Sequence, residues 1–176
     1  MSLRIPVSQA DHVLGPLDAP VVLVEYGDYQ CPFCGEAAPV VKEVQERFGN
    51  DLCLVFRNFP LSDVHPQALP AAITAEYAGR HGQFWAAHDL LYANQDLLGD
   101  ELYAEIAKRL GLSTSGLQQA QADGPEAARI EADFEGGVRS GVNGTPGFFI
   151  NGQLFRPKSS FDELFDAVEA QLGHRR

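Results

Sequence analysis

The amino-acid sequence predicts an α/β fold in which a β-α-β half and a β-β-α half share one four-stranded mixed sheet. Residues 21–24 form a short apolar run, rich in valine, that is typical of a strand buried on both faces. The dipeptide Asn151-Gly152 lies between two apolar runs, which is a strong signal for a β-hairpin. Between these regions, the residues from about 61 to 138 show helical spacing and no convincing strand. We therefore expect one domain, residues 1–176, with an all-helical insertion at about 61–138.

The β-α-β half follows from three consecutive segments. After the strand at 21–24, apolar residues recur at helical spacing between 40 and 48, and Gly49 ends the pattern. Pro39 falls inside this helix, where a proline is expected to produce a kink. The run "DLCLVFRNFPL" at 51–61 predicts a second strand, which is parallel to the first because a helix connects the two.

The insertion is expected to contain several helices, the first of which begins near Pro66. The run "GQFWAAHDLL" at 82–91 is rich in aromatic residues and could form an aromatic binding site. Its helical spacing favours the interior of the insertion instead. Near the C-terminus, Ser160 and Glu163 have the spacing of a capping box and predict the start of a final amphipathic helix.

The composition excludes some classes of function. The chain has 24 acidic and 13 basic residues, a net charge of -11 and a pI near 4.7. Such a surface repels phosphate backbones, so nucleic acid is not an expected partner. No run of about 18 apolar residues predicts a membrane span. The first residues lack the apolar core of a secretory signal. We therefore expect a cytoplasmic location for the chain as given, or a periplasmic or other extracytoplasmic one if a leader was removed.

The motif Cys31-Pro32-Phe33-Cys34 stands at the start of the first predicted helix. Two cysteines at this spacing are compatible with half of a metal site, with a structural disulfide or with a redox-active pair. A closed zinc site needs about four ligands, and the five histidines and Cys53 do not stand at ligand spacing with one another. We therefore expect no metal and no cofactor. Cys53, inside an apolar strand, is expected to be buried and inert.

The position of the pair favours redox chemistry. The thiolate is the reactive form of cysteine, and the unpaired N–H groups at a helix N-terminus stabilise an anion at Cys31. Pro32 fits the first helical turn and keeps the two sulfurs close, with Cys34 toward the core and Cys31 at the surface. The Thr145-Pro146 bond, just before the hairpin, can be cis at modest cost. Its neighbouring backbone groups could then pair with an extended peptide.

These motifs together resemble those of the DsbA-like thiol–disulfide oxidoreductases of the thioredoxin superfamily. The residues that carry the resemblance are the C-x-x-C motif after a buried strand, Pro39 in the helix, "FRNFPL" in the second strand and "GVNGTPGFFING" before the hairpin. The resemblance covers nearly the whole chain and implies a thioredoxin-like fold. It implies that Cys31 is the nucleophile, Cys34 the buried resolving cysteine and Pro146 the cis-proline beside them.

The resemblance also assigns substrate contacts to Pro32, Phe33, Thr145 and Pro146. Two residues depart from the family pattern. Phe33 stands where the best-known relatives have a histidine, and it cannot donate a hydrogen bond to the thiolate. Gly147 replaces a threonine after the cis-proline and is expected to loosen the peptide groove.

Glu25 lies six positions before Cys31, near the end of a strand that should be buried. Burial raises the pKa of a carboxyl group. The resemblance implies that Glu25 accepts a proton from the resolving cysteine. The alternative is a structural ion pair with a cation such as Lys42 or Lys158.

We therefore expect a thiol–disulfide oxidoreductase that acts on protein or peptide thiols and disulfides, with a redox-recycling partner, membrane-bound or soluble. The direction of the reaction depends on the redox poise of the compartment. The alternative function is a peptide-binding, chaperone-like module that uses the groove beside Pro146 without turnover.

Overall fold

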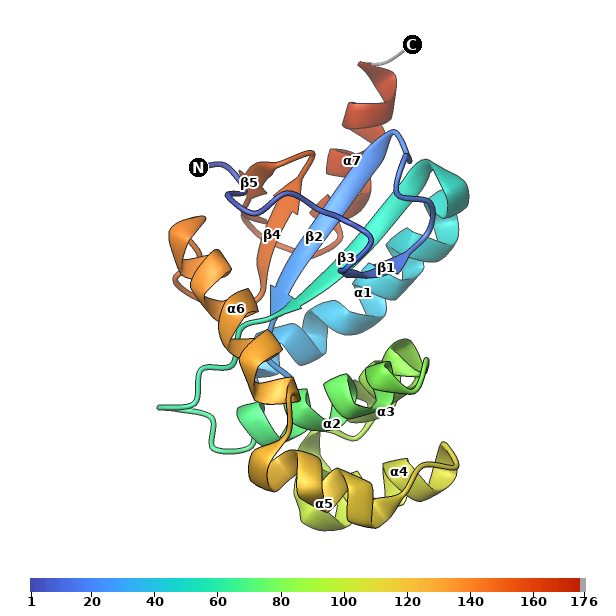
Figure 1. Ribbon diagram of the computed structural model, residues 1–176. Coiled ribbons are helices and arrows are strands. Elements are labelled where there is room, and N and C mark those ends of the chain that lie inside the picture. The colour runs from blue at the N-terminus through green and yellow to red at the C-terminus, as the bar shows by residue number, and fades with distance from the viewer. Residues whose placement is uncertain (175–176) are drawn as a thin grey trace.

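A computed structural model describes residues 1–174 and contains a mixed sheet with helices on both faces (Figure 1). The predicted α/β arrangement is confirmed. The strand order in the sheet is β1-β3-β2-β4-β5, with β2 and β3 parallel and the other pairs antiparallel. The strands are β1 (His12–Leu14), β2 (Val21–Gly27), β3 (Leu52–Asn58), β4 (Gly147–Ile150) and β5 (Gln153–Phe155).

The sheet of the described residues has five strands, so the predicted number of four was wrong. The additional strand, β1, pairs antiparallel with the outer edge of β3, with His12 opposite Phe56. A strand of three residues is too short to show an alternating pattern in the sequence. It covers the edge of β3 that would otherwise expose unpaired backbone groups.

Two layers of helix enclose the sheet, and alternation along the strands decides which side chains face each layer. Leu23 of β2 packs with buried side chains of α1 (Pro32–Phe48) and α7 (Glu163–Gly173) on one face. Val24 and Tyr26 point to the other face, toward α6 (Glu126–Arg139) and the N-terminal segment. Because both faces are covered, β2 and β3 are apolar almost throughout, as the sequence indicated.

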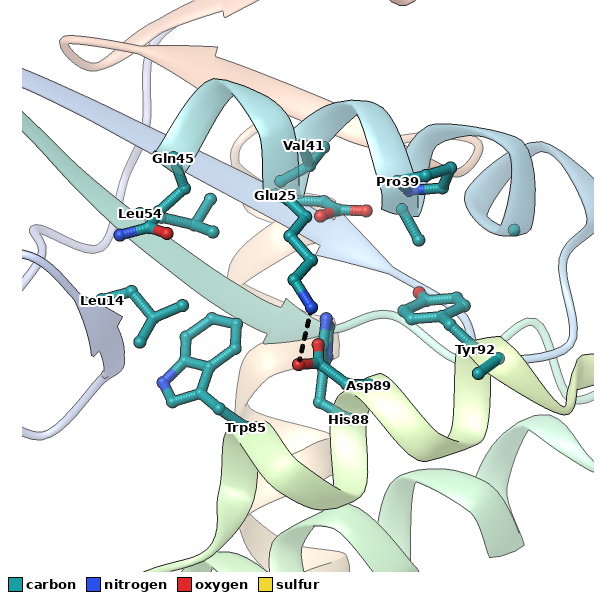
Figure 2. Close-up of a pocket in the computed structure, with 14 residues that line it drawn as sticks. Leu14, Glu25, Pro39, Val41, Gln45, Leu54, Trp85, His88, Asp89 and Tyr92 are labelled. Atoms are coloured by element: carbon teal, nitrogen blue, oxygen red, sulfur yellow. Dashed lines mark ion pairs between the residues drawn. The ribbon is translucent and has the colours of Figure 1, made fainter. Parts of the chain in front are cut away.

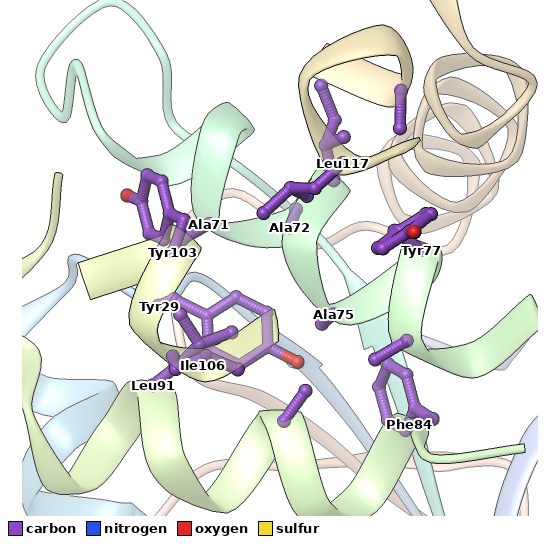
Figure 3. Close-up of a cluster of buried hydrophobic side chains, with 14 of the residues drawn as sticks. Tyr29, Ala71, Ala72, Ala75, Tyr77, Phe84, Leu91, Tyr103, Ile106 and Leu117 are labelled. Atoms are coloured by element: carbon purple, nitrogen blue, oxygen red, sulfur yellow. The ribbon is translucent and has the colours of Figure 1, made fainter. Parts of the chain in front are cut away.

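The predicted helical insertion follows β3 and lies at the end of the sheet where β2 and β3 finish (Figure 1). Before α6 it contains α2 (Ala68–Arg80), α3 (Phe84–Ala93), the 3-10 turn η2 (Gln95–Leu97), α4 (Asp100–Arg109) and α5 (Thr114–Asp123). The first helix therefore begins two residues later than Pro66. Figure 3 shows that Tyr29, from the turn after β2, is buried among side chains of this insertion. The insertion and the turn before α1 thus share one apolar cluster.

The local signals near the C-terminus agree with the structure. Asn151 and Gly152 have φ values of 47° and 80°, as a two-residue hairpin turn requires. The Glu163 carboxylate accepts hydrogen bonds from the backbone N–H groups of Lys158, Ser159 and Ser160 at 2.7, 2.9 and 3.1 Å. The capping contact of Glu163 with Ser160 therefore forms, although α7 itself begins at Glu163.

Candidate active site

The two cysteines lie at the N-terminus of α1, directly after the turn that follows β2. Cys31 is the residue that precedes the helix, and Pro32 is its first residue. The Asp28 carboxylate accepts hydrogen bonds from the backbone N–H groups of Gln30 and Cys31 at 2.8 and 3.2 Å. These bonds hold the turn in one conformation, because a short acidic side chain satisfies N–H groups that the helix cannot.

The loop before β4 lies beside this turn because β4 is the sheet neighbour of β2, with Tyr26 opposite Gly147. The peptide bond between Thr145 and Pro146 is cis. The Cys31 Sγ atom is 3.5 Å from the Thr145 carbonyl oxygen. Segments more than a hundred residues apart in the sequence therefore meet at Cys31.

The two thiols differ strongly in their acidity. The pKa of Cys31 is lowered from 9.0 to about 5, first by a hydrogen bond from the Cys34 thiol and further by Thr145 and by the N–H groups of Cys34 and Phe33. Burial opposes this shift. The pKa of Cys34 is raised well above 9.0, first by burial, then by its hydrogen bond to Cys31 and by the nearby Glu25 charge. One thiol of the pair is therefore a thiolate at neutral pH, while the other keeps its proton.

The sequence predicted that Cys31 lies at the surface, but the structure buries it almost completely. Cys31 is 4% exposed and Cys34 is 0% exposed, because the loop of Thr145 and the Asp28 turn both cover the first cysteine. Cys31 remains the more accessible of the two. Cys53 is fully buried in β3.

Glu25 is buried in β2, and the pKa of its carboxyl group is raised from 4.5 to about 8. The main cause is burial, and the negative charge of Cys31 adds to it. Among the described residues, Glu25 forms no ion pair; Lys42 instead lies 3.8 Å from Asp89. The geometry therefore gives no support to the alternative of a structural ion pair.

A groove of about 370 Å³ runs beside the cysteine pair. Its walls include Phe33, which is 62% exposed, and the loop of Thr145 and Pro146. A Cβ atom at Gly147 would lie 3.1 Å from a methyl group of Val142. Glycine at this position therefore lets the Val142 side chain approach the strand that borders the groove.

The structure also brings Gln95 to the site, which the sequence did not indicate. Its side-chain amide donates hydrogen bonds to the carbonyl oxygens of Tyr29 and Cys31 at 2.9 and 2.8 Å. A Cβ atom at Gly35 would collide with the Gln95 side chain, so α1 can accept this contact only with a glycine there. Gln95 belongs to η2 of the insertion, 64 positions away from Cys31, and no local pattern connects the two.

Asp28 is the second residue that was missed. Besides the turn before α1, its carboxylate binds the backbone N–H of Leu61 at 2.9 Å and the His65 ring at 2.8 Å. It thereby joins the turn before α1 to the segment that leads into the insertion. An acidic residue at the end of a buried strand was the only signal that could have drawn attention to it.

Within residues 1–174, no group of three or more His, Cys, Asp or Glu side chains is arranged to hold a metal ion. No helix among these residues is both long and apolar enough to cross a membrane.

Comparison with known proteins places this chain in a family. Residues 7–170 match the family model described as "Thioredoxin", and the chain belongs to this family. A thioredoxin-like oxidoreductase from Silicibacter pomeroyi DSS-3 has a TM-score of 0.80 and 27% identity, with 94% of each chain covered. The α-DsbA1 protein of Wolbachia pipientis has a TM-score of 0.82 and 20% identity, with 98% of this chain and 95% of that chain covered. The fold is therefore the DsbA-like form of the thioredoxin fold. The match at 27% identity supports an oxidoreductase.

A curated relative contains a similar sequence within a longer protein. The Na(+)/H(+) antiporter NhaA 1 of Salinispora arenicola (strain CNS-205) is 42% identical over 177 residues. The match covers 100% of this chain and 27% of the antiporter. The chain thus spans about a quarter of the length of the curated relatives it matches.

Proposed function

We propose that the chain is a thiol–disulfide oxidoreductase that exchanges disulfides with protein or peptide thiols through Cys31 and Cys34. The observation that carries this proposal is the unequal placement of the two thiols. Cys31 directly precedes α1 beside the Thr145 carbonyl, Cys34 is fully buried, and their pKa values shift in opposite directions. A cysteine pair with a purely structural role needs no such difference. Disulfide exchange, by contrast, needs one reactive thiolate and one protonated partner. We further propose that residues 1–176 form one catalytic domain with the helical insertion inside it.

In the oxidising direction, a substrate thiolate attacks the Cys31 sulfur of the Cys31–Cys34 disulfide. The bond between the two cysteines breaks, the substrate becomes linked to Cys31, and Cys34 leaves with the electron pair and takes a proton. A second substrate thiolate then attacks the substrate sulfur of this mixed disulfide. The substrate disulfide forms and Cys31 leaves as a thiolate, which its low pKa favours. The enzyme has gained the two electrons that the substrate has lost.

In the reducing direction, the Cys31 thiolate attacks a substrate disulfide and Cys34 resolves the mixed disulfide. The Cys34 thiol must lose its proton for this step, and we assign the role of acceptor to Glu25. Its carboxyl group is buried near Cys34, and its pKa of about 8 allows it to take up or release a proton near neutral pH. The same group would return the proton in the oxidising direction.

We assign substrate binding to Pro32, Phe33, Thr145 and Pro146, of which the last three line the groove. The contact between Cys31 and the Thr145 carbonyl supports this assignment, because an extended peptide paired with that loop would place its sulfur beside Cys31. The turnover of the pair needs a redox-recycling partner. A cytoplasmic location would favour reduction and an extracytoplasmic one oxidation. The antiporter relatives, in which a matching segment is part of a transporter, favour a site of action near a membrane.

The test is the reduction of insulin by dithiothreitol, followed by turbidity. The wild-type protein should accelerate the reaction, Cys31→Ser should not, and Cys34→Ser should accumulate a mixed disulfide through Cys31. The second candidate function, peptide binding without turnover, predicts equal rates for the wild type and Cys31→Ser while both bind the peptide. That result would reject the oxidoreductase proposal.

A further inference from the structure

A second hollow lies between α1, α3 and the sheet (Figure 2). It has a volume of about 420 Å³, which is within the range of small-molecule sites. Most of its wall is apolar and is formed by side chains such as Leu14, Val41, Leu54 and Trp85. Neither cysteine lines it, and of the residues assigned to the disulfide exchange only Glu25 does.

Two buried polar atoms at this cavity have no partner. In the part of the chain that the structure describes, neither Glu25 Oε1 nor the Tyr92 hydroxyl forms a hydrogen bond. Both residues line the cavity, and Figure 2 shows the Glu25 carboxylate and the Tyr92 hydroxyl group at its wall beneath α1; the two unpartnered oxygen atoms themselves are buried. A buried polar group without a partner is costly. Two such groups at the wall of one cavity indicate that a bound molecule reaching them would supply the missing hydrogen-bond partner.

The charges around the cavity indicate what kind of molecule fits. Lys42 and Asp89 form an ion pair at the mouth, where both side chains are more than half exposed. The buried His88 ring is neutral, because burial lowers its pKa to about 3, and one ring nitrogen is bonded to the Tyr29 hydroxyl. The inner wall therefore offers no unpaired charge that could neutralise an ion at neutral pH.

We propose that this cavity binds a small neutral molecule with an aromatic or other apolar ring and one carbonyl or amide group. The ring lies against Trp85 among the apolar side chains, and the carbonyl oxygen accepts hydrogen bonds from the Tyr92 hydroxyl and the Glu25 carboxyl group. An anion is excluded because it would lose its hydration in the cavity without meeting an unpaired positive charge.

The probes are three molecules of equal size and different charge: phenylacetamide, phenylacetate and 2-phenylethylammonium. Trp85 is the chain's only tryptophan, and its indole N–H is fixed by a 3.1 Å bond to the Val13 carbonyl. Its fluorescence therefore reports directly on occupancy. Phenylacetamide should change the emission saturably, with a dissociation constant in the millimolar range for so small a ligand. Phenylacetate should bind more than about tenfold more weakly.

Tyr92→Phe keeps the ring and removes the hydroxyl group. It should weaken the binding of phenylacetamide by about three- to tenfold, which is the contribution of one neutral hydrogen bond. Tyr77→Phe is the matched control, because its hydroxyl is bonded to Ser113 outside the cavity and its loss should leave the affinity unchanged. The absence of a saturable fluorescence change would mean that the cavity holds water only and would overturn the proposal. Tighter binding of 2-phenylethylammonium than of phenylacetamide would overturn the claim that the ligand is neutral. Equal affinities of wild type and Tyr92→Phe would overturn the assigned hydrogen bond.

The occupied cavity would also regulate the redox pair, and this extension rests on the proposed function. A ligand bonded to Glu25 would occupy the group that exchanges the Cys34 proton. Saturating phenylacetamide should therefore slow resolution of the mixed disulfide in the wild type and have less effect in Tyr92→Phe. If phenylacetamide binds but does not slow resolution of the mixed disulfide, the regulation is rejected and the binding site stands. If the wild type binds phenylacetamide but has no oxidoreductase activity, only the proposed function is rejected.

Discussion

Replacing Glu25 by glutamine should stabilise the reduced protein by an amount that grows with pH. The carboxyl group has its pKa raised from 4.5 to about 8 in the folded state, chiefly by burial. In the unfolded chain the same group ionises near its ordinary value. The folded protein therefore binds more protons than the unfolded chain between these two values, and its free energy of unfolding falls as the pH rises. Glutamine has the same shape and does not titrate.

The magnitude follows from the two pKa values. Below pH 4.5 the Glu25 carboxyl group is mostly protonated in both the folded and the unfolded state, so its ionisation does not lower the free energy of unfolding. From there to about pH 8 the free energy of unfolding should fall by about 1.4 kcal/mol per pH unit. At pH 7, about 2.5 units above the ordinary value, the accumulated loss is about 3 kcal/mol. This is a large share of the stability of a typical domain.

The assay is urea denaturation of the reduced wild type and Glu25→Gln at several values between pH 4.5 and 8.5. The difference in unfolding free energy should rise by about 3 kcal/mol between pH 4.5 and 7 and level off above pH 8. Glu43→Gln, an exposed carboxylate on α1, controls for the change in net charge. A difference that stays constant with pH would refute the argument, because Glu25 would then ionise equally easily in both states.

Three further predictions concern the redox pair. Alkylation of the reduced protein should label Cys31 first, with a pH midpoint of about 5; faster labelling of Cys34 or Cys53 would contradict the assigned roles. Phe33→His should raise the reduction potential by about 30 mV in a glutathione titration. A charged hydrogen bond to the thiolate is worth about 1.5–3 kcal/mol, and the exposure of this side chain favours the lower end of that range. An equal or lower potential would show that the hydrogen bonds already present determine the potential. Gln95→Leu should lower the free energy of unfolding by about 1–3 kcal/mol, because two hydrogen bonds to buried carbonyls are lost. It should also raise the alkylation midpoint of Cys31, and an unchanged midpoint would reduce Gln95 to a purely structural residue.

The elements that sequence analysis found have strong local signals. The strands β2 and β3, the hairpin at Asn151 and the helix that begins at Pro32 each depend on residues within a few positions of one another. The strand β1 was missed because three residues show no period, and because its partner on β3 lies about forty positions further along the chain.

The sequence by itself determined the fold class and the motif on which the proposed chemistry depends. A buried strand, a C-x-x-C motif at a helix N-terminus and a Thr-Pro before a hairpin are contiguous patterns, so they can be identified without coordinates. Even the buried carboxyl group of Glu25 could be expected, because it lies in a continuous apolar strand.

Only the tertiary structure decided what surrounds these residues. Gln95, Asp28 and the cavity of Glu25 and Tyr92 depend on how the helical insertion packs against the start of α1. Thiol and carboxyl pKa values depend on burial and on hydrogen bonds whose partners lie up to 114 residues away. Such contacts leave no periodic trace in the sequence, because side chains that meet across the fold are related by packing and not by spacing.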